Sequence, residues 1–189
     1  MRIIAGKFKN RAIETPEGLT TRPLLSRIRK SLFGILEPHL AGARVLDCFS
    51  GSGMIAMESF SRGATYVMSV DADPKAIAVA KANHKKICPD AEYYLTRGDV
   101  LDMLPRLAQQ NQPYDLIGVM PPFGQDLVAK TLQIIDSNPS LLAPDAIIFA
   151  QRDVEEEVSL DWEHFEHVRT KKYGRNIFEF FMPPEIESD

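Results

Sequence analysis

Val45-Leu46-Asp47-Cys48-Phe49-Ser50-Gly51-Ser52-Gly53 is the stretch that decides the fold. A short apolar run ends in an acid and passes into a turn with two glycines, after which a helical pattern begins. Glycine lets the backbone turn tightly and approach a bound group without a Cβ atom in the way. A Gly-x-Gly turn is a weak signal by itself. In this setting it predicts a parallel strand that delivers a nucleotide-like ligand to a helix N-terminus.

Short β-like runs alternate with helical stretches from residue 43 onward. Strands are predicted over residues 44–49, 65–70, 91–96, 114–119 and 145–150. Helices are predicted over residues 53–62, 74–86, 100–110 and 124–136. This alternation is typical of βαβ units and predicts an α/β fold with a mostly parallel sheet. No helical pattern separates residues 162–172 from 176–182, so we expect a closing antiparallel hairpin at the sheet edge.

The N-terminal quarter is basic, although the whole chain has a formal net charge of −4. Residues 1–44 contain nine Lys and Arg residues against three Glu, so the rest of the chain is strongly acidic. This quarter is predicted to form a short hairpin over residues 2–13 and a helix over residues 21–38. A basic segment on an acidic body indicates a protein that grips a polyanion from one side, although most charge runs are simply solvated faces.

Composition bounds the remaining possibilities. The length of 189 residues and the hydrophobic content of 44% predict one globular domain with a full core. No apolar run approaches the roughly 20 residues that span a bilayer, and no apolar signal-peptide region precedes the first charges, so a cytoplasmic location is expected. Cys48 and Cys88 provide neither a disulfide framework nor a metal-ligand pair. His164 and His167 form an H-x-x-H without flanking ligands, so we expect no metal.

Three carboxylates follow three successive predicted strands. Asp47 precedes the glycine turn, where it can meet a cationic or amine-bearing ligand, or a water. Asp71 ends the second strand, where an acid can accept both hydroxyls of a ribose. Asp99 ends the third strand, where an acid can accept an adenine amine. Core packing does not explain acids at these three places together, so they favour a nucleotide-like cofactor.

The glycine turn leaves a nicotinamide cofactor open as an alternative. The dinucleotide fingerprint has a third glycine, and Ala56 stands at that position, which the fingerprint tolerates. A hydride-transfer enzyme also needs a site for that chemistry, and the sequence offers no convincing one. Met120-Pro121-Pro122-Phe123, after the fourth predicted strand, points elsewhere. A rigid Pro-Pro turn with an aromatic residue is suited to hold a planar substrate beside the cofactor.

Several segments, in order along almost the whole chain, carry a resemblance to a known family. These segments are residues 2–9, 21–23, 27–29, 32–33, 47–53, 61–64, 98–99 and 121–123. On them the chain resembles the class I S-adenosylmethionine-dependent methyltransferases, and specifically the bacterial RsmD-type enzymes that methylate the exocyclic N2 of a guanine in 16S ribosomal RNA. The Thr21-Arg22-Pro23 segment and the basic helix are more specific to this family than the glycines.

The resemblance implies a Rossmann-like sheet of seven strands that holds S-adenosylmethionine across its carboxyl edge. Residues 43–184 would form the methyltransferase domain, residues 1–42 a basic RNA-binding extension, and residues 185–189 a frayed tail. The cofactor residues implied are Asp47, Phe49, Ser50, Gly51, Gly53, Asp71, Ala72, Asp99 and Val100. Met120, Pro121, Pro122 and Phe123 would hold the flipped-out guanine for catalysis.

The family also implies a partner, which is 16S rRNA within a 30S subunit or an assembly intermediate. The basic N-terminal segment would grip its phosphate backbone. The residues expected to bind RNA are Arg2, Lys7, Lys9, Arg11, Arg22, Arg27, Arg29 and Lys30.

Met120 departs from the family pattern, in which an acid opens the Pro-Pro turn. A carboxylate accepts hydrogen bonds strongly, whereas the thioether of Met120 is a weak acceptor. Two hypotheses follow from this substitution. The first is an active guanine-N2 methyltransferase with a weakened or rearranged catalytic turn. The alternative is a methyltransferase-fold protein that binds cofactor and RNA and turns over poorly or not at all.

Overall fold

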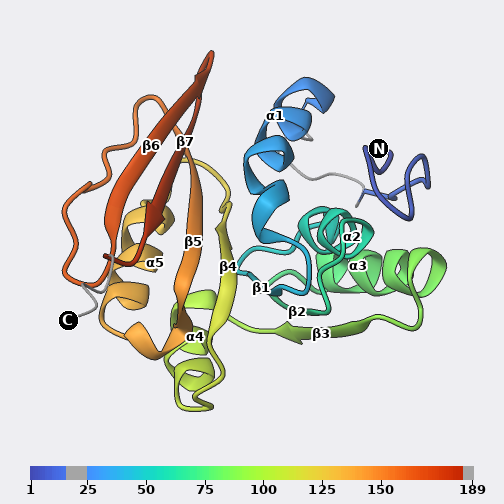
Figure 1. Cartoon of the computed structure of the whole chain (residues 1–189), viewed down its shortest axis with the longest axis horizontal. Coiled ribbons are helices and arrows are strands. Elements are labelled where there is room, and N and C mark those ends of the chain that lie inside the picture. The colour runs from blue at the N-terminus through green and yellow to red at the C-terminus, as the bar shows by residue number, and fades with distance from the viewer. Residues whose placement is uncertain (16–24, 185–189) are drawn as a thin grey trace.

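The sheet has seven strands in the order β3-β2-β1-β4-β5-β7-β6 (Figure 1). The computed structural model describes residues 1–15 and 25–184. The five strands β1 to β5 are parallel, and β7 pairs antiparallel with both β5 and β6. The predicted α/β class with a mostly parallel sheet and a closing antiparallel hairpin is therefore confirmed. The strands are β1 (Arg44–Asp47), β2 (Tyr66–Asp71), β3 (Glu92–Arg97), β4 (Tyr114–Val119), β5 (Leu142–Asp153), β6 (Glu166–Tyr173) and β7 (Asn176–Met182).

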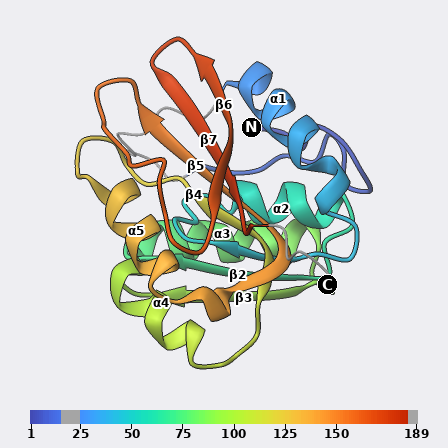
Figure 2. The same cartoon turned by 60° about the vertical axis from the view of Figure 1, so that its left-hand side comes forward.

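Helices cover both faces of the sheet, and two buried hydrophobic clusters fill the spaces between the layers. α1, α2 and α3 lie on one face of the sheet, and α4 and α5 lie on the other (Figures 1 and 2). Side chains of the first group belong to one cluster and those of the second group to the other. None of the helices within residues 1–15 and 25–184 is long and apolar enough to cross a membrane. The helices are α1 (Ser26–Leu36), α2 (Met54–Ser61), α3 (Pro74–Ile87), α4 (Val100–Ala108) and α5 (Leu127–Asp136), with short 3-10 turns at Glu37–His39 and Pro139–Leu141.

The main differences from the predicted boundaries have local causes. α5 begins at Leu127 rather than at residue 124, because Gly124 and Asp126 have φ angles of +80° and +53°, which a helix cannot contain. β5 extends to Asp153, beyond the predicted 145–150, because its last residues pair with β7. α1 begins at Ser26 rather than near residue 21, because Leu25 has an extended ψ of +140°, which a helix cannot contain. Residues 16–24 and the predicted tail 185–189 lie outside the described residues.

The N-terminal segment is anchored on α2. An isolated antiparallel bridge between Arg2 and Ala12 closes the predicted hairpin. The backbone N–H groups of Lys7 and Phe8 donate to the carbonyl and the Oγ of Ser61, at 2.7 and 2.9 Å. A Cβ atom at Gly6, whose φ is +83°, would lie 1.7 Å from the Ser61 carbonyl oxygen. Only glycine permits this approach, so the segment docks on the last turn of α2.

Candidate active site

The predicted cofactor and substrate turns meet at one edge of the sheet. β1 lies between β2 and β4, so the order of the strands reverses direction there. Open α/β sheets bind their ligands beyond the carboxyl ends of the strands at such a switch point. Asp47 ends β1, Asp71 ends β2, and Met120 follows β4. The topology thus gathers residues that are up to 73 positions apart in the sequence.

The glycine turn has the backbone shape that its sequence predicts. Gly51 and Gly53 have positive φ angles of +50° and +75°. A Cβ at Gly53 would lie 3.2 Å from the Cβ of Ala80 and 3.4 Å from the Oη of Tyr93, so the turn is closed on that side. At Gly51 a Cβ would meet nothing within 4 Å. The turn therefore packs tightly against the protein at Gly53 and leaves open space at Gly51.

Asp71 fixes this turn to the end of β2. One carboxylate oxygen, Oδ2, accepts the N–H of Gly51 at 2.8 Å, and the other, Oδ1, accepts the N–H of Asp73 at 2.9 Å. A carboxylate has about four lone-pair sites, so each oxygen can accept a further bond. Asp71 is thus held in one orientation and retains capacity for two hydroxyl donors.

Asp47 is a fully buried acid beneath the turn. Its exposure is 0%, and the Oγ of Ser69 lies 3.5 Å from Oδ2. Burial, reinforced by the nearby charge of Asp71, raises the pKa of Asp47 from 3.8 to about 7, against smaller opposing effects from Ser69 and the Phe49 backbone. The carboxyl group can therefore change its charge near neutral pH.

Unpartnered polar atoms under the turn fit a polar ligand. Among the described residues, the Oδ1 of Asp47, the Oγ of Ser50 and the Oη of Tyr93 are buried without a hydrogen-bond partner. Buried polar groups without partners are rare in folded proteins, and several in one region indicate a ligand or ordered water. S-adenosylmethionine has an ammonium, a carboxylate and two ribose hydroxyls, so its polar groups suit this set of residues.

The remaining predicted cofactor residues lie along the same edge. Asp99 is exposed, and its Oδ1 caps α4 by accepting the N–H of Leu101 at 2.9 Å. Its other oxygen makes no hydrogen bond within the described part of the chain. Ala72 is exposed, Val100 is buried at the start of α4, and Phe49 packs on the cluster beneath α4 and α5. Sequence reasoning missed Ser69 and Tyr93, because neither belongs to a local motif.

The Pro-Pro turn leaves β4 with its aromatic side chain outward. Met120 is partly buried and packs against the cluster beneath α1 and α2. Pro121 is buried, whereas Pro122 is exposed and Phe123 is 43% exposed. Phe123 thus offers an accessible ring at the mouth of the site. Met120 thus contributes an apolar contact at the start of the turn.

Glu156, which sequence reasoning missed, holds the far end of this turn. Its Oε1 accepts the N–H of Gly124 at 2.8 Å, and its Oε2 accepts the N–H of Asp153 at 2.9 Å. The two segments border an open depression of about 550 Å³ beside the turn. The depression is lined by Phe123, Gly124, Asp126, Asp153, Glu155, Glu156, Glu157 and Arg175.

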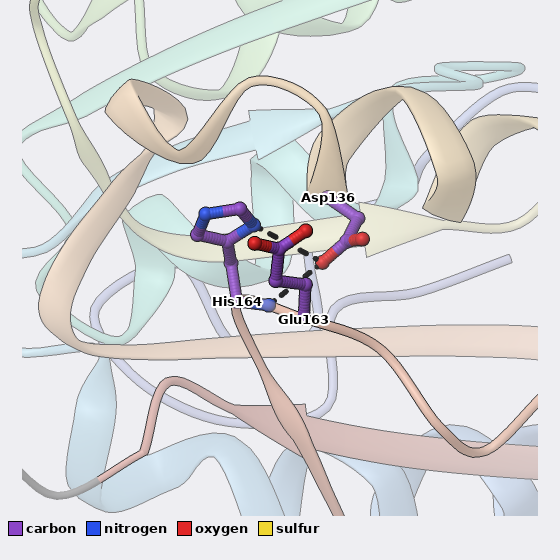
Figure 3. Close-up of side chains that lie close together, drawn as sticks. All are labelled: Asp136, Glu163 and His164. Atoms are coloured by element: carbon purple, nitrogen blue, oxygen red, sulfur yellow. Dashed lines mark hydrogen bonds and ion pairs between the residues drawn. The ribbon is translucent and has the colours of Figure 1, made fainter.

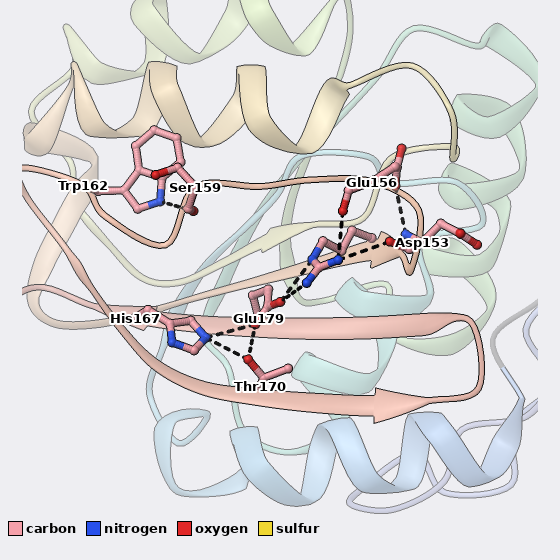
Figure 4. Close-up of polar contacts among 8 residues, drawn as sticks. Asp153, Glu156, Ser159, Trp162, His167, Thr170 and Glu179 are labelled. Atoms are coloured by element: carbon pink, nitrogen blue, oxygen red, sulfur yellow. Dashed lines mark hydrogen bonds and ion pairs between the residues drawn. The ribbon is translucent and has the colours of Figure 1, made fainter.

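A network of hydrogen bonds and ion pairs around the buried Glu179 continues from this loop into the closing hairpin (Figure 4). Arg152 donates to the backbone carbonyl of Glu156 at 2.8 Å and twice to Oε1 of Glu179, at 3.0 and 2.7 Å. Glu179 is 1% exposed, and its Oε2 meets His167 at 2.9 Å and also accepts from Thr170. The strands β5, β6 and β7 are therefore locked together behind the depression.

The predicted RNA-binding residues divide into three groups. Arg2, Lys7, Lys9, Arg11, Arg27 and Lys30 are exposed, as an RNA-binding role requires. Arg22 lies outside the described residues. Arg29 is only 2% exposed, lies 3.4 Å from Glu58 and donates to the backbone of Arg2 at 3.0 Å. The prediction that Arg29 binds RNA is therefore wrong, because its guanidinium is buried and paired with groups of the protein itself.

Asp136, Glu163 and His164 gather away from the predicted site (Figure 3). The N–H of His164 donates to Oδ1 of Asp136 at 2.8 Å, and its Nδ1 lies 3.5 Å from the same oxygen. Asp136 ends α5, and His164 precedes β6. The backbone hydrogen bond ties the end of α5 to the loop before the hairpin.

Comparison with known proteins agrees with this geometry. A family model described as conserved hypothetical protein 95 matches residues 1–182. A Bacillus subtilis (strain 168) protein named "Putative rRNA methyltransferase YlbH" is 31% identical over 174 residues, which cover 92% of this chain and 94% of that protein. Ribosomal RNA small subunit methyltransferase D of Escherichia coli (strain K12) is 30% identical over 162 residues, which cover 82% of this chain and 76% of the relative.

The solved structure described as "Putative methyltransferase yhhF from Escherichia coli" has a TM-score of 0.83 and 26% identity, over 98% of this chain and 99% of that one. The strand order, the glycine turn and these matches define the class as a Rossmann-like methyltransferase. The chain belongs to the family described as conserved hypothetical protein 95, the RsmD-type methyltransferases. The resemblance seen in the sequence is thereby confirmed.

Proposed function

We propose that this protein transfers the methyl group of S-adenosylmethionine to the exocyclic N2 of a guanine in 16S rRNA. The observation that carries the proposal is the juxtaposition of the glycine turn after β1 with the Pro-Pro turn after β4. Neighbouring strands present both turns at one edge, so a cofactor on the first and a planar base on the second would lie side by side. A methyltransferase needs this arrangement because its two substrates must meet.

The cofactor would lie along the ends of β1, β2 and β3. When bound, S-adenosylmethionine supplies an electrophilic methyl group on a sulfonium. Asp71 would accept the ribose hydroxyls through the lone pairs that its two backbone bonds leave free. Asp99 would accept the adenine amine through the oxygen that does not cap α4. Asp47 lies under the turn, where an ionised carboxylate favours the cationic part of the ligand.

The guanine would lie against the Pro-Pro turn. Phe123 offers an exposed ring for stacking, and extraction of a base from its stack costs a few kcal/mol. The amine lone pair of guanine is delocalised into the ring, so acceptors aimed at its N–H bonds help the nitrogen to attack. The carbonyl groups of Met120 and Pro121 can accept such bonds, whereas the Met120 thioether accepts only weakly.

RNA is the expected substrate because the family relatives are named rRNA methyltransferases and the exposed cations of the N-terminal segment suit phosphates. The 16S rRNA of a 30S subunit or an assembly intermediate is the proposed form. The test is transfer of tritiated methyl groups from S-adenosylmethionine to ribosomal RNA from cells that lack the gene. We expect label in 16S rRNA, and mapping should place it on one guanine N2. Label on another base, or in 23S rRNA only, would contradict the assignment.

Met120 favours a second candidate, a protein that binds the cofactor and RNA with little turnover. Loss of one charge-stabilising group is worth on the order of 10²–10³ in rate, by analogy with oxyanion-hole donors. Slow transfer at saturating cofactor and RNA, with normal affinity for both, would identify this candidate. Single-turnover labelling with enzyme in excess distinguishes slow chemistry from none.

A further inference from the structure

The edge strand β6 is basic, which sequence reasoning about the N-terminal quarter did not include. Arg169, Lys171 and Lys172 are exposed on it, at the open side of the sheet. Within residues 1–15 and 25–184, none of these three side chains takes part in an ion pair. Unpaired cations on an edge strand discourage pairing with another sheet, and this is the simplest role for them. The faces of the sheet on which these cations lie indicate a further role.

Strand pairing assigns each cation to a face. Arg169 lies opposite Phe180 and Lys171 opposite Phe178, and both phenylalanines belong to the cluster beneath α1 and α2. Directly opposed residues share a face of the sheet, so Arg169 and Lys171 lie on the side of α1. Lys172 lies opposite Ile177, one residue away, and therefore points to the side of α4 and α5.

α1 brings its own cations to the same face. The hydroxyl of Ser31 on α1 is hydrogen-bonded to that of Tyr173 at the end of β6, so the helix and the strand are in contact (Figure 2). Arg27 lies one turn before Ser31 on the same side of the helix, and the side chain of Lys30, next to Ser31 in the sequence, is exposed to solvent. No acidic residue occurs in α1. Cations therefore flank the contact from both elements.

The strand β6 runs toward the edge of the sheet where the candidate active site lies. β6 and β5 both run antiparallel to β7, so β6 ends at the carboxyl edge of the sheet with β5. Arg175, two residues after Tyr173, lines the depression beside the Pro-Pro turn. The guanidinium of Arg175 already forms ion pairs with Asp153 and Glu155. An RNA backbone bound along Arg169 and Lys171 would therefore reach the Pro-Pro turn, where the target base is expected.

We propose that Arg169 and Lys171 of β6, with Arg27 and Lys30 of α1, form a basic track that binds RNA phosphates and leads the chain to the Pro-Pro turn. The proposal rests on the proposed function, which supplies RNA as the substrate. It adds a binding surface from the C-terminal hairpin to the one expected at the N-terminus. The recognition is electrostatic and independent of sequence, because phosphates are common to all nucleotides.

The test compares two double variants in the full-length protein. Arg169→Ala with Lys171→Ala removes two cations from the track. Arg106→Ala with Lys172→Ala removes the same charge from the side of α4 and α5, where Arg106 is exposed in the last turn of α4. Affinity for a 16S rRNA fragment is measured by filter binding across a range of salt concentrations. Calorimetric binding of S-adenosylmethionine reports whether each variant is folded.

Each phosphate contact contributes about 0.7–0.9 to the slope of log affinity against log salt. We expect the track variant to lose about 1.5 in slope and roughly tenfold or more in affinity at low salt. The control variant should match the wild type, and both should bind the cofactor normally. Equal losses in the two variants, or no loss in the track variant, would overturn the track and leave the proposed function standing. Wild-type protein that binds the cofactor and no RNA would overturn both.

Discussion

Glu156 accepts a hydrogen bond from the backbone N–H of Gly124 at 2.8 Å, across 32 residues of sequence. This bond joins the Pro-Pro turn to the loop after β5. The second oxygen of Glu156 is fixed by Asp153, and its backbone carbonyl is fixed by Arg152. The turn that would hold the target base is therefore braced from outside itself.

Glu156→Ala should lower methyl transfer by about ten- to a hundredfold, because a displaced turn misplaces the reacting base. Cofactor affinity should not change, since Glu156 lies away from the ends of β1 to β3. Glu157→Ala is the matched control, because Glu157 lines the same depression and makes no hydrogen bond within the described residues. Single-turnover rates at saturating RNA provide the measurement. Equal rates for the two variants would show that Glu156 does not position the turn.

Asp71→Ala should weaken binding of S-adenosylmethionine by about ten- to a hundredfold, because charge-assisted hydrogen bonds contribute roughly 1.5–3 kcal/mol. The variant also loses the anchor of Gly51. Asp73→Ala is the control, since Asp73 caps α3 two residues away and should cost only about 1 kcal/mol of stability. Isothermal calorimetry compares the two. If Asp71→Ala binds as tightly as the wild type, the cofactor assignment fails.

Met120→Asp should raise the rate of methyl transfer to 16S rRNA, by up to the order of 10²–10³ if no other group has taken over the role of the acid. Met120→Leu keeps the apolar contact without the sulfur and should leave the rate unchanged. Tritium incorporation under single-turnover conditions reports both. A fast wild type that Met120→Asp slows would show that the turn works without a carboxylate.

The buried Asp47 predicts a specific dependence of stability on pH. Its pKa is about 7 in the folded protein against an ordinary value of 3.8, so the folded state keeps the proton to higher pH. The stability that this proton affords should therefore be lost as pH rises from about 4 to about 7, by at most about 4 kcal/mol. Asp47→Asn cannot ionise and should lack this loss. Urea unfolding at pH 5 and pH 8 measures the difference, and parallel pH profiles for the two proteins would contradict it.

The sequence predicts what local patterns determine. The glycine turn, the acids that end successive strands and the Pro-Pro turn are all encoded in short runs, and the structure brings them to one edge. Glu156 could not be predicted, because its bond to Gly124 depends on how β4 and β5 lie together. The burial of Arg29 cannot be predicted from local sequence, because its partner, Glu58, lies on another helix. The common face of Arg169 and Lys171 could not be predicted either, because it depends on how β6 pairs with β7.

The helix α2 has a consequence for how a target is chosen. Its first residue follows the glycine turn, and Glu58 and Ser61 in its second half anchor the basic N-terminal segment. With a rise of 1.5 Å per residue, about 7.5 Å along the axis of α2 separates Gly53 from Glu58. The proposed RNA-binding segment and the proposed methyl-donor site are thus both held by one short helix. A nucleotide would be selected by its distance from the gripped phosphates as much as by its chemistry.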